Sequence, residues 1–102
     1  MNKLIEEHYD EFVEACRRRH VKKIELFGSA ATDAFDPERS DLDFFVSFEK
    51  SESVNLFNAY FGLQEDLQEL FGRSVDLVMD GASKNPYFLA EAAKTRTVVY
   101  AA

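Results

Sequence analysis

Hydrophobic and polar residues follow two different periods along this chain, and each period predicts one kind of element. Apolar residues recur at helical spacing over residues 3–19 and again over residues 54–71, so both segments are expected to form amphipathic helices. A shorter helix is expected over residues 87–94, because Asn85-Pro86 suits an N-cap followed by the first helical position. The pattern therefore predicts three helices spread along the chain.

Shorter runs, rich in β-formers or alternating between apolar and polar residues, predict strands between these helices. The runs cover residues 21–27, 42–48, 74–80 and 97–100. In the second run the even positions share one apolar face, which is expected in the core: Leu42, Phe44, Val46 and Phe48. Asp41 and Asp43 stand at the start of the opposite face, where a sheet edge could place them in a site.

Composition limits the classes of protein to which the chain can belong. The 102 residues fit one compact domain spanning residues 1–102, and 46% hydrophobic residues, including 10 Phe, can fill a core. The net charge of −7 argues against binding nucleic acid through its phosphates and against binding an anionic membrane surface. Cys16 has no partner for an internal disulfide, and no apolar run approaches the ~20 residues of a membrane span, so we expect a cytoplasmic protein.

Three aspartates and one turn carry the candidate chemistry. Asp41 and Asp43 lie two residues apart on one predicted strand, with Cα atoms roughly 6.5 Å apart, and Asp76 interrupts an otherwise apolar strand. Gly28-Ser29 ends the first strand, where free N–H groups and small side chains would let a phosphate approach.

Each of these features also has a plain structural explanation. Gly28-Ser29 can be a simple turn and helix cap, and each aspartate can be an exposed polar residue on a half-buried strand. Taken together they form one consistent geometry, in which three carboxylates hold two divalent cations beside a bound triphosphate. Asp76 is then the best candidate for the general base that takes the acceptor proton.

The same residues resemble a known family, the minimal nucleotidyltransferases of the DNA polymerase β superfamily. The resemblance rests on Leu26-Phe27-Gly28-Ser29, Ser40-Asp41-Leu42-Asp43 and Val75-Asp76-Leu77-Val78, and it extends over nearly the whole chain. It implies an α+β fold, with a mixed β-sheet and helices packed mainly on one face. It assigns nucleotide binding to Gly28, Ser29 and Ser40, and metal binding and catalysis to Asp41, Asp43 and Asp76.

The resemblance also implies a reaction and a partner. Family members transfer AMP from ATP with Mg²⁺, and those of this size are often antitoxins that adenylylate a tyrosine of a HEPN toxin. The family commonly has Ala-Arg-Gly soon after Gly-Ser, where this chain has Ala31-Thr32-Asp33, and Arg39, Lys84 or Arg96 could supply the missing cation. Two alternatives therefore stay open: an antitoxin that acts by binding alone, and a subunit of a small-molecule nucleotidyltransferase.

Overall fold

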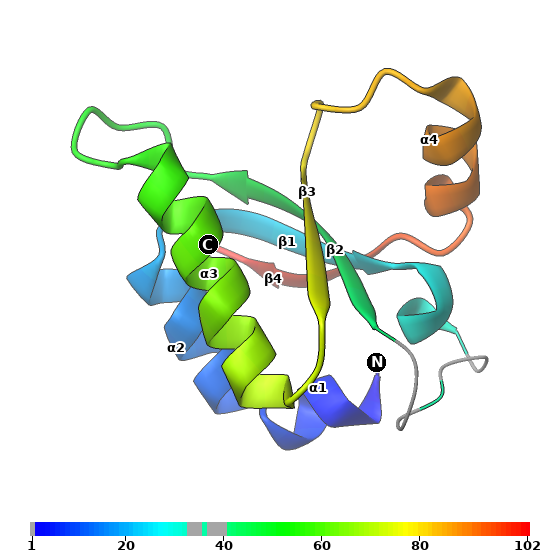
Figure 1. Cartoon of the computed structure of the whole chain (residues 1–102), viewed down its shortest axis with the longest axis horizontal. Coiled ribbons are helices and arrows are strands. Elements are labelled where there is room, and N and C mark those ends of the chain that lie inside the picture. Colours follow the sequence, from blue (N-terminus) through cyan, green and yellow to red (C-terminus); the bar gives the residue numbers. More distant parts are fainter. Residues whose placement is uncertain (1, 33–35, 37–40) are drawn as a thin grey trace.

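A computed structural model describes residues 2–32, 36 and 41–102 as a four-stranded sheet with helices (Figure 1). The helices are α1 (Lys3–Glu7), α2 (Tyr9–Arg18), α3 (Leu56–Phe71) and α4 (Pro86–Ala93), and one 3₁₀ turn, η1, covers Gly28–Ala31. The strands are β1 (Val21–Phe27), β2 (Leu42–Phe48), β3 (Val75–Met79) and β4 (Thr97–Ala101). All four expected strands are present, and the first two have the expected bounds. The later elements differ from expectation by one or two residues at their ends.

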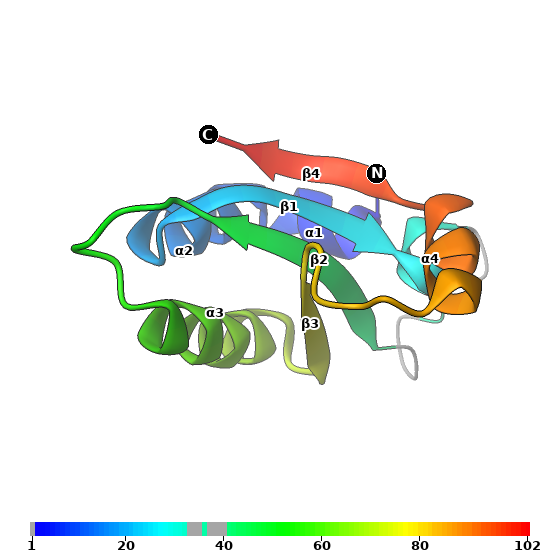
Figure 2. The same ribbon diagram turned by 90° about the horizontal axis from the view of Figure 1, so that it is seen from above.

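The sheet is mixed, with strand order β3-β2-β1-β4 (Figure 2). β1 pairs antiparallel with β2 and with β4, whereas β2 and β3 are parallel and are joined through α3. In Figure 1, α4 stands apart from the other three helices. The expected α+β fold, with a mixed sheet and helices mainly on one face, is confirmed.

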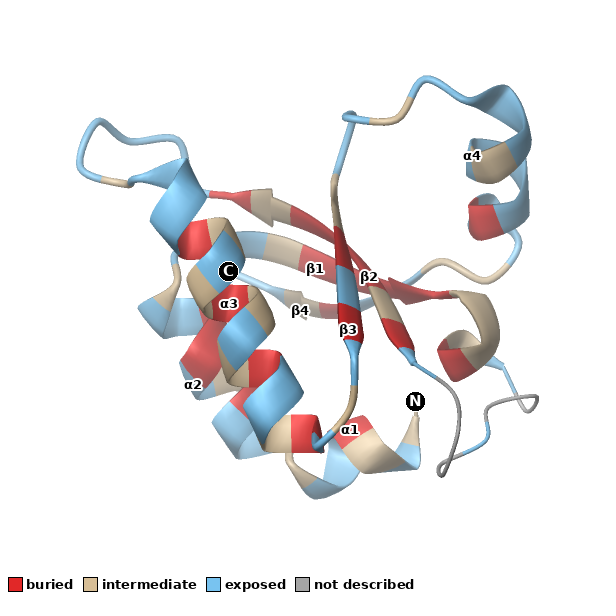
Figure 3. Cartoon of the chain, in the orientation of Figure 1, coloured by how far each residue is buried: buried red, intermediate tan, exposed pale blue. Residues whose placement is uncertain are grey.

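The main core lies between the sheet and the first three helices. The even face of β2 contributes Leu42, Phe44, Val46 and Phe48, as the alternation predicts, and α3 contributes Leu63 and Leu67. Figure 3 shows buried segments on both elements. Cys16 belongs to this core, and burial raises the pKa of its thiol to about 12, so it behaves as a small hydrophobic residue. Within the described residues, no helix is long and apolar enough to cross a bilayer.

The first predicted helix is two helices, which corrects the expectation of one helix over residues 3–19. His8 leaves the helical conformation between α1 and α2, with φ −118° and ψ 25°, and its ring packs edge-on against Phe71 at 6.1 Å between centroids. No Gly or Pro marks this break. The hydrophobic spacing continues through it, with Ile5 and Phe12 both fully buried, so the sequence pattern could not reveal it.

Gly62, inside α3, leaves room for an ion pair between the α2 end and α3. Arg19 Nε donates to Asp66 Oδ2 at 2.7 Å, and Arg18 also pairs with Asp66. The Arg19 guanidinium lies across Gly62, where an added Cβ would come within 2.5 Å of its carbon. Glycine is a poor helix former, but a larger residue at position 62 would displace the Arg19 guanidinium from this ion pair.

Candidate functional site

The parallel register of β2 and β3 places two of the three predicted aspartates side by side. Asp43 is the register partner of Asp76, and on the other side of β2 it is the partner of Phe27, at the end of β1. Asp43 is half-buried and Asp76 is exposed. Asp41 is exposed and immediately precedes β2. The sheet thus brings Asp43 and Asp76 together next to the turn that follows β1.

The carboxylate pair carries an unfavourable charge. Burial, a hydrogen bond to Asp76 and the negative charges of Asp76 and Asp41 together raise the pKa of Asp43 to about 6. A hydrogen bond between two carboxyl groups requires a proton on one of them, because an ionised carboxylate can only accept. The repulsion between the two like charges favours the same protonated state. A divalent cation in place of that proton would stabilise both groups in their ionised form.

Asp43 and Asp76 suit a Mg²⁺ ion whose remaining coordination positions are filled by substrate and water. In the part of the chain that the structure describes, no group of three or more His, Cys, Asp and Glu side chains is close enough to hold a metal ion by itself. Mg²⁺ commonly takes one or two protein carboxylates, and waters and substrate phosphates fill its other positions. Asp43 and Asp76 fit that role, and Asp41 is close enough for its charge to act on Asp43.

Side chains of α3 hold β3 in the register that places Asp76. Gln64 Nε2 donates to the Val75 carbonyl at 2.9 Å, and the Val75 N–H donates to Gln68 Oε1 at 3.2 Å. The Tyr60 hydroxyl donates to the Leu77 carbonyl. These bonds flank Asp76 on both sides, at an outer edge of the sheet that would otherwise expose unpaired backbone groups.

The turn after β1 needs its glycine for two reasons. Gly28 has φ +74°, which L side chains rarely adopt, and a Cβ there would lie 3.0 Å from Asp43 Oδ2. The backbone at Gly28 is therefore packed against the side chain of Asp43. Ser29, the second predicted phosphate-binding residue, is half-buried in the following 3₁₀ turn. Because η1 is a single short turn, its dipole contributes little to anion binding.

Thr95 forms a hydrogen bond with this turn, and nothing in the sequence pattern predicted that contact. The Gly28 N–H donates to Thr95 Oγ1 at 2.9 Å, so this N–H is already bonded within the protein. Thr95 lies between α4 and β4, and β4 pairs with β1 in a register that brings the two segments together. No local signal marks Thr95, because its role follows from the pairing of the first and last strands.

Arg96 has its charge neutralised within the fold. Its guanidinium donates to both Glu25 oxygens at 2.9 and 3.0 Å, pairs with Asp80 at 2.9 Å and lies 4.1 Å from the Phe45 ring centroid. These contacts lower the pKa of Glu25 and raise that of Arg96. Arg96, one of the three cations considered from sequence, is thus held by a carboxylate of β1 and by Asp80, which follows β3. Lys84 is exposed between β3 and α4. Arg39 and Ser40 lie outside the described residues, so the assignment of Ser40 to nucleotide binding stays a prediction.

Most of the chain matches a known family. Residues 9–99 match the family described as nucleotidyltransferase domain. A protein of Methanocaldococcus jannaschii, provisionally named a protein adenylyltransferase, is 42% identical over 67 residues. The aligned segment covers 66% of this chain and 64% of that relative, so this chain matches under two thirds of the relative's length.

Solved structures show the same fold. One described as a minimal nucleotidyltransferase superposes with a TM-score of 0.69 at 26% identity, covering 94% of both chains. A toxin–antitoxin crystal structure with AMP-PNP gives a TM-score of 0.66 at 19% identity, over 91% of this chain and 73% of that one. A mutant of the toxin–antitoxin pair MntA–HpeT gives 0.65 at 18% identity, over 92% and 72%. At these two lower identities the likeness concerns the fold alone.

Proposed function

Because this chain belongs to the nucleotidyltransferase domain family, we propose that it transfers AMP from ATP to a hydroxyl group of a partner protein. The observation that carries the proposal is the pairing of Asp43 with Asp76 across β2 and β3, directly beside Gly28. The family match and the close packing of Gly28 on Asp43 together favour a phosphate-handling site over two chance surface aspartates.

The proposed roles follow from position. Asp41, Asp43 and Asp76 would hold Mg²⁺, which when bound offsets the charge of the triphosphate and of the leaving pyrophosphate. The turn at Gly28 and Ser29, together with Ser40, would receive the phosphates. The acceptor oxygen forms a bond to the α-phosphorus as the bond to the pyrophosphate oxygen breaks. Asp76, the more exposed member of the pair, accepts the proton of the acceptor hydroxyl.

We propose a tyrosine of a HEPN-type toxin as the acceptor, so that this chain acts as its antitoxin in the cytoplasm. Two findings support this choice: the name of the M. jannaschii relative and the likeness in fold to toxin–antitoxin structures. A second candidate is an antitoxin that neutralises its partner by contact alone. It is favoured by the acid at position 33 and by the engagement of Arg96 with Glu25 and Asp80. A small-molecule nucleotidyltransferase subunit is a third candidate.

Calorimetry of ATP binding tests the proposed function. Wild type should bind ATP with Mg²⁺ and bind it much more weakly without Mg²⁺, and Asp41→Asn/Asp43→Asn should lose the Mg²⁺-dependent part. The matched control Asp10→Asn/Glu14→Gln changes the charge equally on the exposed side of α2 and should bind as wild type does. Full Mg²⁺-dependent binding by the site double mutant would contradict the proposal.

Mass spectrometry of the partner then separates the first two candidates. A toxin incubated with wild type, ATP and Mg²⁺ should gain the mass of AMP on a tyrosine, and the site double mutant should leave it unmodified. If the double mutant neutralises the toxin as fully as wild type does, contact alone is sufficient and the second candidate holds.

A further inference from the structure

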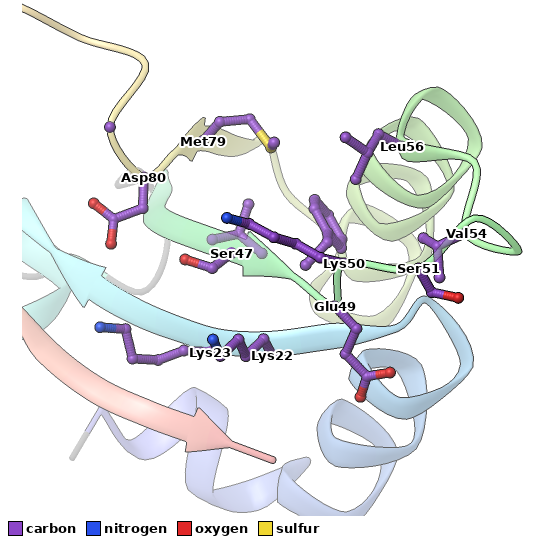
Figure 4. A pocket seen from close by; sticks show the side chains of 13 residues that line it. Lys22, Lys23, Ser47, Glu49, Lys50, Ser51, Val54, Leu56, Met79 and Asp80 are labelled. Carbon is purple, nitrogen blue, oxygen red and sulfur yellow. The ribbon is translucent and has the colours of Figure 1, made fainter.

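A cavity of about 730 Å³ lies at the end of the sheet opposite the carboxylate pair (Figure 4). Asp43 and Asp76 stand near the starts of the parallel strands β2 and β3, whereas the cavity is lined by Phe48 and Met79, which end these strands. The cavity therefore does not belong to the candidate site.

The cavity gathers positive charge in an acidic protein. Three of the six lysines of the chain line it, namely Lys22, Lys23 and Lys50. Lys23 pairs with Glu25 at 3.3 Å, and the Asp80 carboxylate in the cavity wall is already paired with Arg96. In Figure 4, Lys50 extends toward Ser47 and Met79, and Glu49 points away from them. Glu49 and Asp80 also line the cavity, but within the described residues neither Lys22 nor Lys50 forms an ion pair.

An apolar surface continues from the cavity along α3. Leu56 lines the cavity and is 50% exposed, and the next residue, Phe57, is 70% exposed. Phe61 follows one turn later, is 50% exposed, and its ring lies 4.7 Å from that of Phe57. Single exposed apolar residues are ordinary, but adjacent large ones on the first turns of a helix mark an interaction site.

We propose that Lys22, Lys50, Leu56, Phe57 and Phe61, here called the α3–lysine surface, bind a segment of a partner protein that carries carboxylates beside an aromatic or aliphatic side chain. The apolar side chain would pack on the two phenylalanines and Leu56, and the carboxylates would pair with the lysines. Charge complementarity selects this occupant. A protein of net charge −7 repels acidic segments in general, so a lysine cluster beside an apolar patch gives such a segment one favoured place.

A second copy of this chain fits the surface less well. An acidic groove lies between α2 and α3 and is lined by Asp10, Glu11, Glu14 and Glu69, together with Arg18 and its partner Asp66. A contact between that groove and the α3–lysine surface joins two different patches, so it would continue from copy to copy unless its rotation closed a ring. A foreign segment involves no such chain of contacts.

This inference deepens the proposed function. It rests on that function for the partner's role as acceptor, but the binding itself does not require transfer. The test is a selection of random peptides displayed on phage against the whole chain, followed by fluorescence anisotropy of the enriched peptides. We expect sequences with at least two carboxylates next to Phe, Leu or Tyr, and weaker binding as salt rises. Asp43→Asn should bind them as wild type does, which separates failure of docking from failure of catalysis.

Matched variants locate the binding. Lys22→Glu/Lys50→Glu should weaken peptide binding by about tenfold or more, and Phe57→Ser/Phe61→Ser by a similar factor. Lys84→Glu/Lys94→Glu makes the same change of charge elsewhere on the surface and should leave binding intact. Circular dichroism verifies that the variants, all at exposed or partly exposed positions, remain folded.

Several results would overturn the proposal. These are failure to enrich any peptide, enriched peptides without carboxylates, or undiminished binding by Lys22→Glu/Lys50→Glu. Sedimentation that shows self-association abolished by Phe57→Ser/Phe61→Ser would assign the surface to a second copy instead. Displacement of the peptide by a single-stranded oligonucleotide at lower concentration than by free peptide would assign it to nucleic acid.

Discussion

The face of the sheet covered by α1, α2 and α3 and the face against which α4 lies contain different chemistry. On the first face β2 contributes Leu42, Phe44, Val46 and Phe48 to one continuous apolar core. On the second face the buried cluster is small, with Phe27, Phe45 and Ala92 and the partly buried Val78 and Phe88. Charged side chains flank this cluster on both sides.

Successive rows across the second face show how the charges are placed. One row joins Phe27, Asp43 and Asp76, and the next joins Glu25, Phe45 and Val78. Arg96 covers Phe45 and ties Glu25 to Asp80. The same strands thus supply a core with one set of alternate residues and a polar site with the other. Stability should depend mainly on the first face, and activity on the second.

Phe44→Ala should give the largest effect on stability. Phe44 is fully buried in the main core and contacts the Phe12 ring at 5.9 Å, so its truncation should cost about 3–5 kcal/mol of unfolding free energy. Phe88→Ala, in the partly buried cluster of the other face, should cost about half as much or less. Urea unfolding followed by circular dichroism measures both. Equal losses would show that the two faces share stability evenly.

The first face was predictable from sequence and the second only in part. The alternation in β2 identified Phe44 as core and Asp43 as its opposite, because period-2 patterning is a local property. The pairing of Asp43 with Asp76 required the parallel register, which depends on how α3 crosses between β2 and β3. The contacts of Thr95 with Gly28 and of Arg96 with Glu25 join segments far apart along the chain, so no local pattern could predict them.

Asp43→Asn should lower the activity strongly and, without metal, should raise the stability near neutral pH. Nucleotidyl transfer should fall by at least about a hundredfold, since the substitution removes a carboxylate from the proposed metal site. Without metal, the folded-state pKa of Asp43, about 6, lies above the usual value for an aspartate. Its protonated form therefore stabilises the fold at low pH, and that stability is lost as pH rises toward and through 6.

The difference in unfolding free energy between Asp43→Asn and wild type tests the predicted direction of this pH dependence. Without Mg²⁺ the variant should become the more stable of the two as pH rises from about 4 to about 7, and urea unfolding across that range measures the change. Addition of Mg²⁺ should reduce the difference by stabilising wild type alone. A wild type that gains stability over the variant in this range without metal would contradict the unfavourable charge on the pair.

Arg96→Met should give an intermediate loss of stability, about 1–3 kcal/mol. Glu25 is buried and, among the described residues, would keep only Lys23 as an ion-pair partner. The wild-type pair lowers the pKa of Glu25, so its contribution is present above the unfolded-state pKa and is lost as pH falls through the folded-state pKa. Arg96→Met should therefore show a smaller loss on acidification. Glu25→Gln/Arg96→Met should recover part of the stability, and no recovery would mean that packing of Arg96 on Phe45 is the larger effect.

Thr95→Val should have the smallest effect on stability. It should still reveal whether activity and stability can be changed separately. Valine keeps the shape of threonine but cannot accept the Gly28 N–H, which would cost about 1 kcal/mol. If that bond orients the turn for phosphate, the KM for ATP should rise while the unfolding free energy changes little, and Thr95→Ser should restore the KM. A loss of stability without any change in KM would place Thr95 among the structural residues, with its bond to Gly28 serving the fold and not phosphate binding.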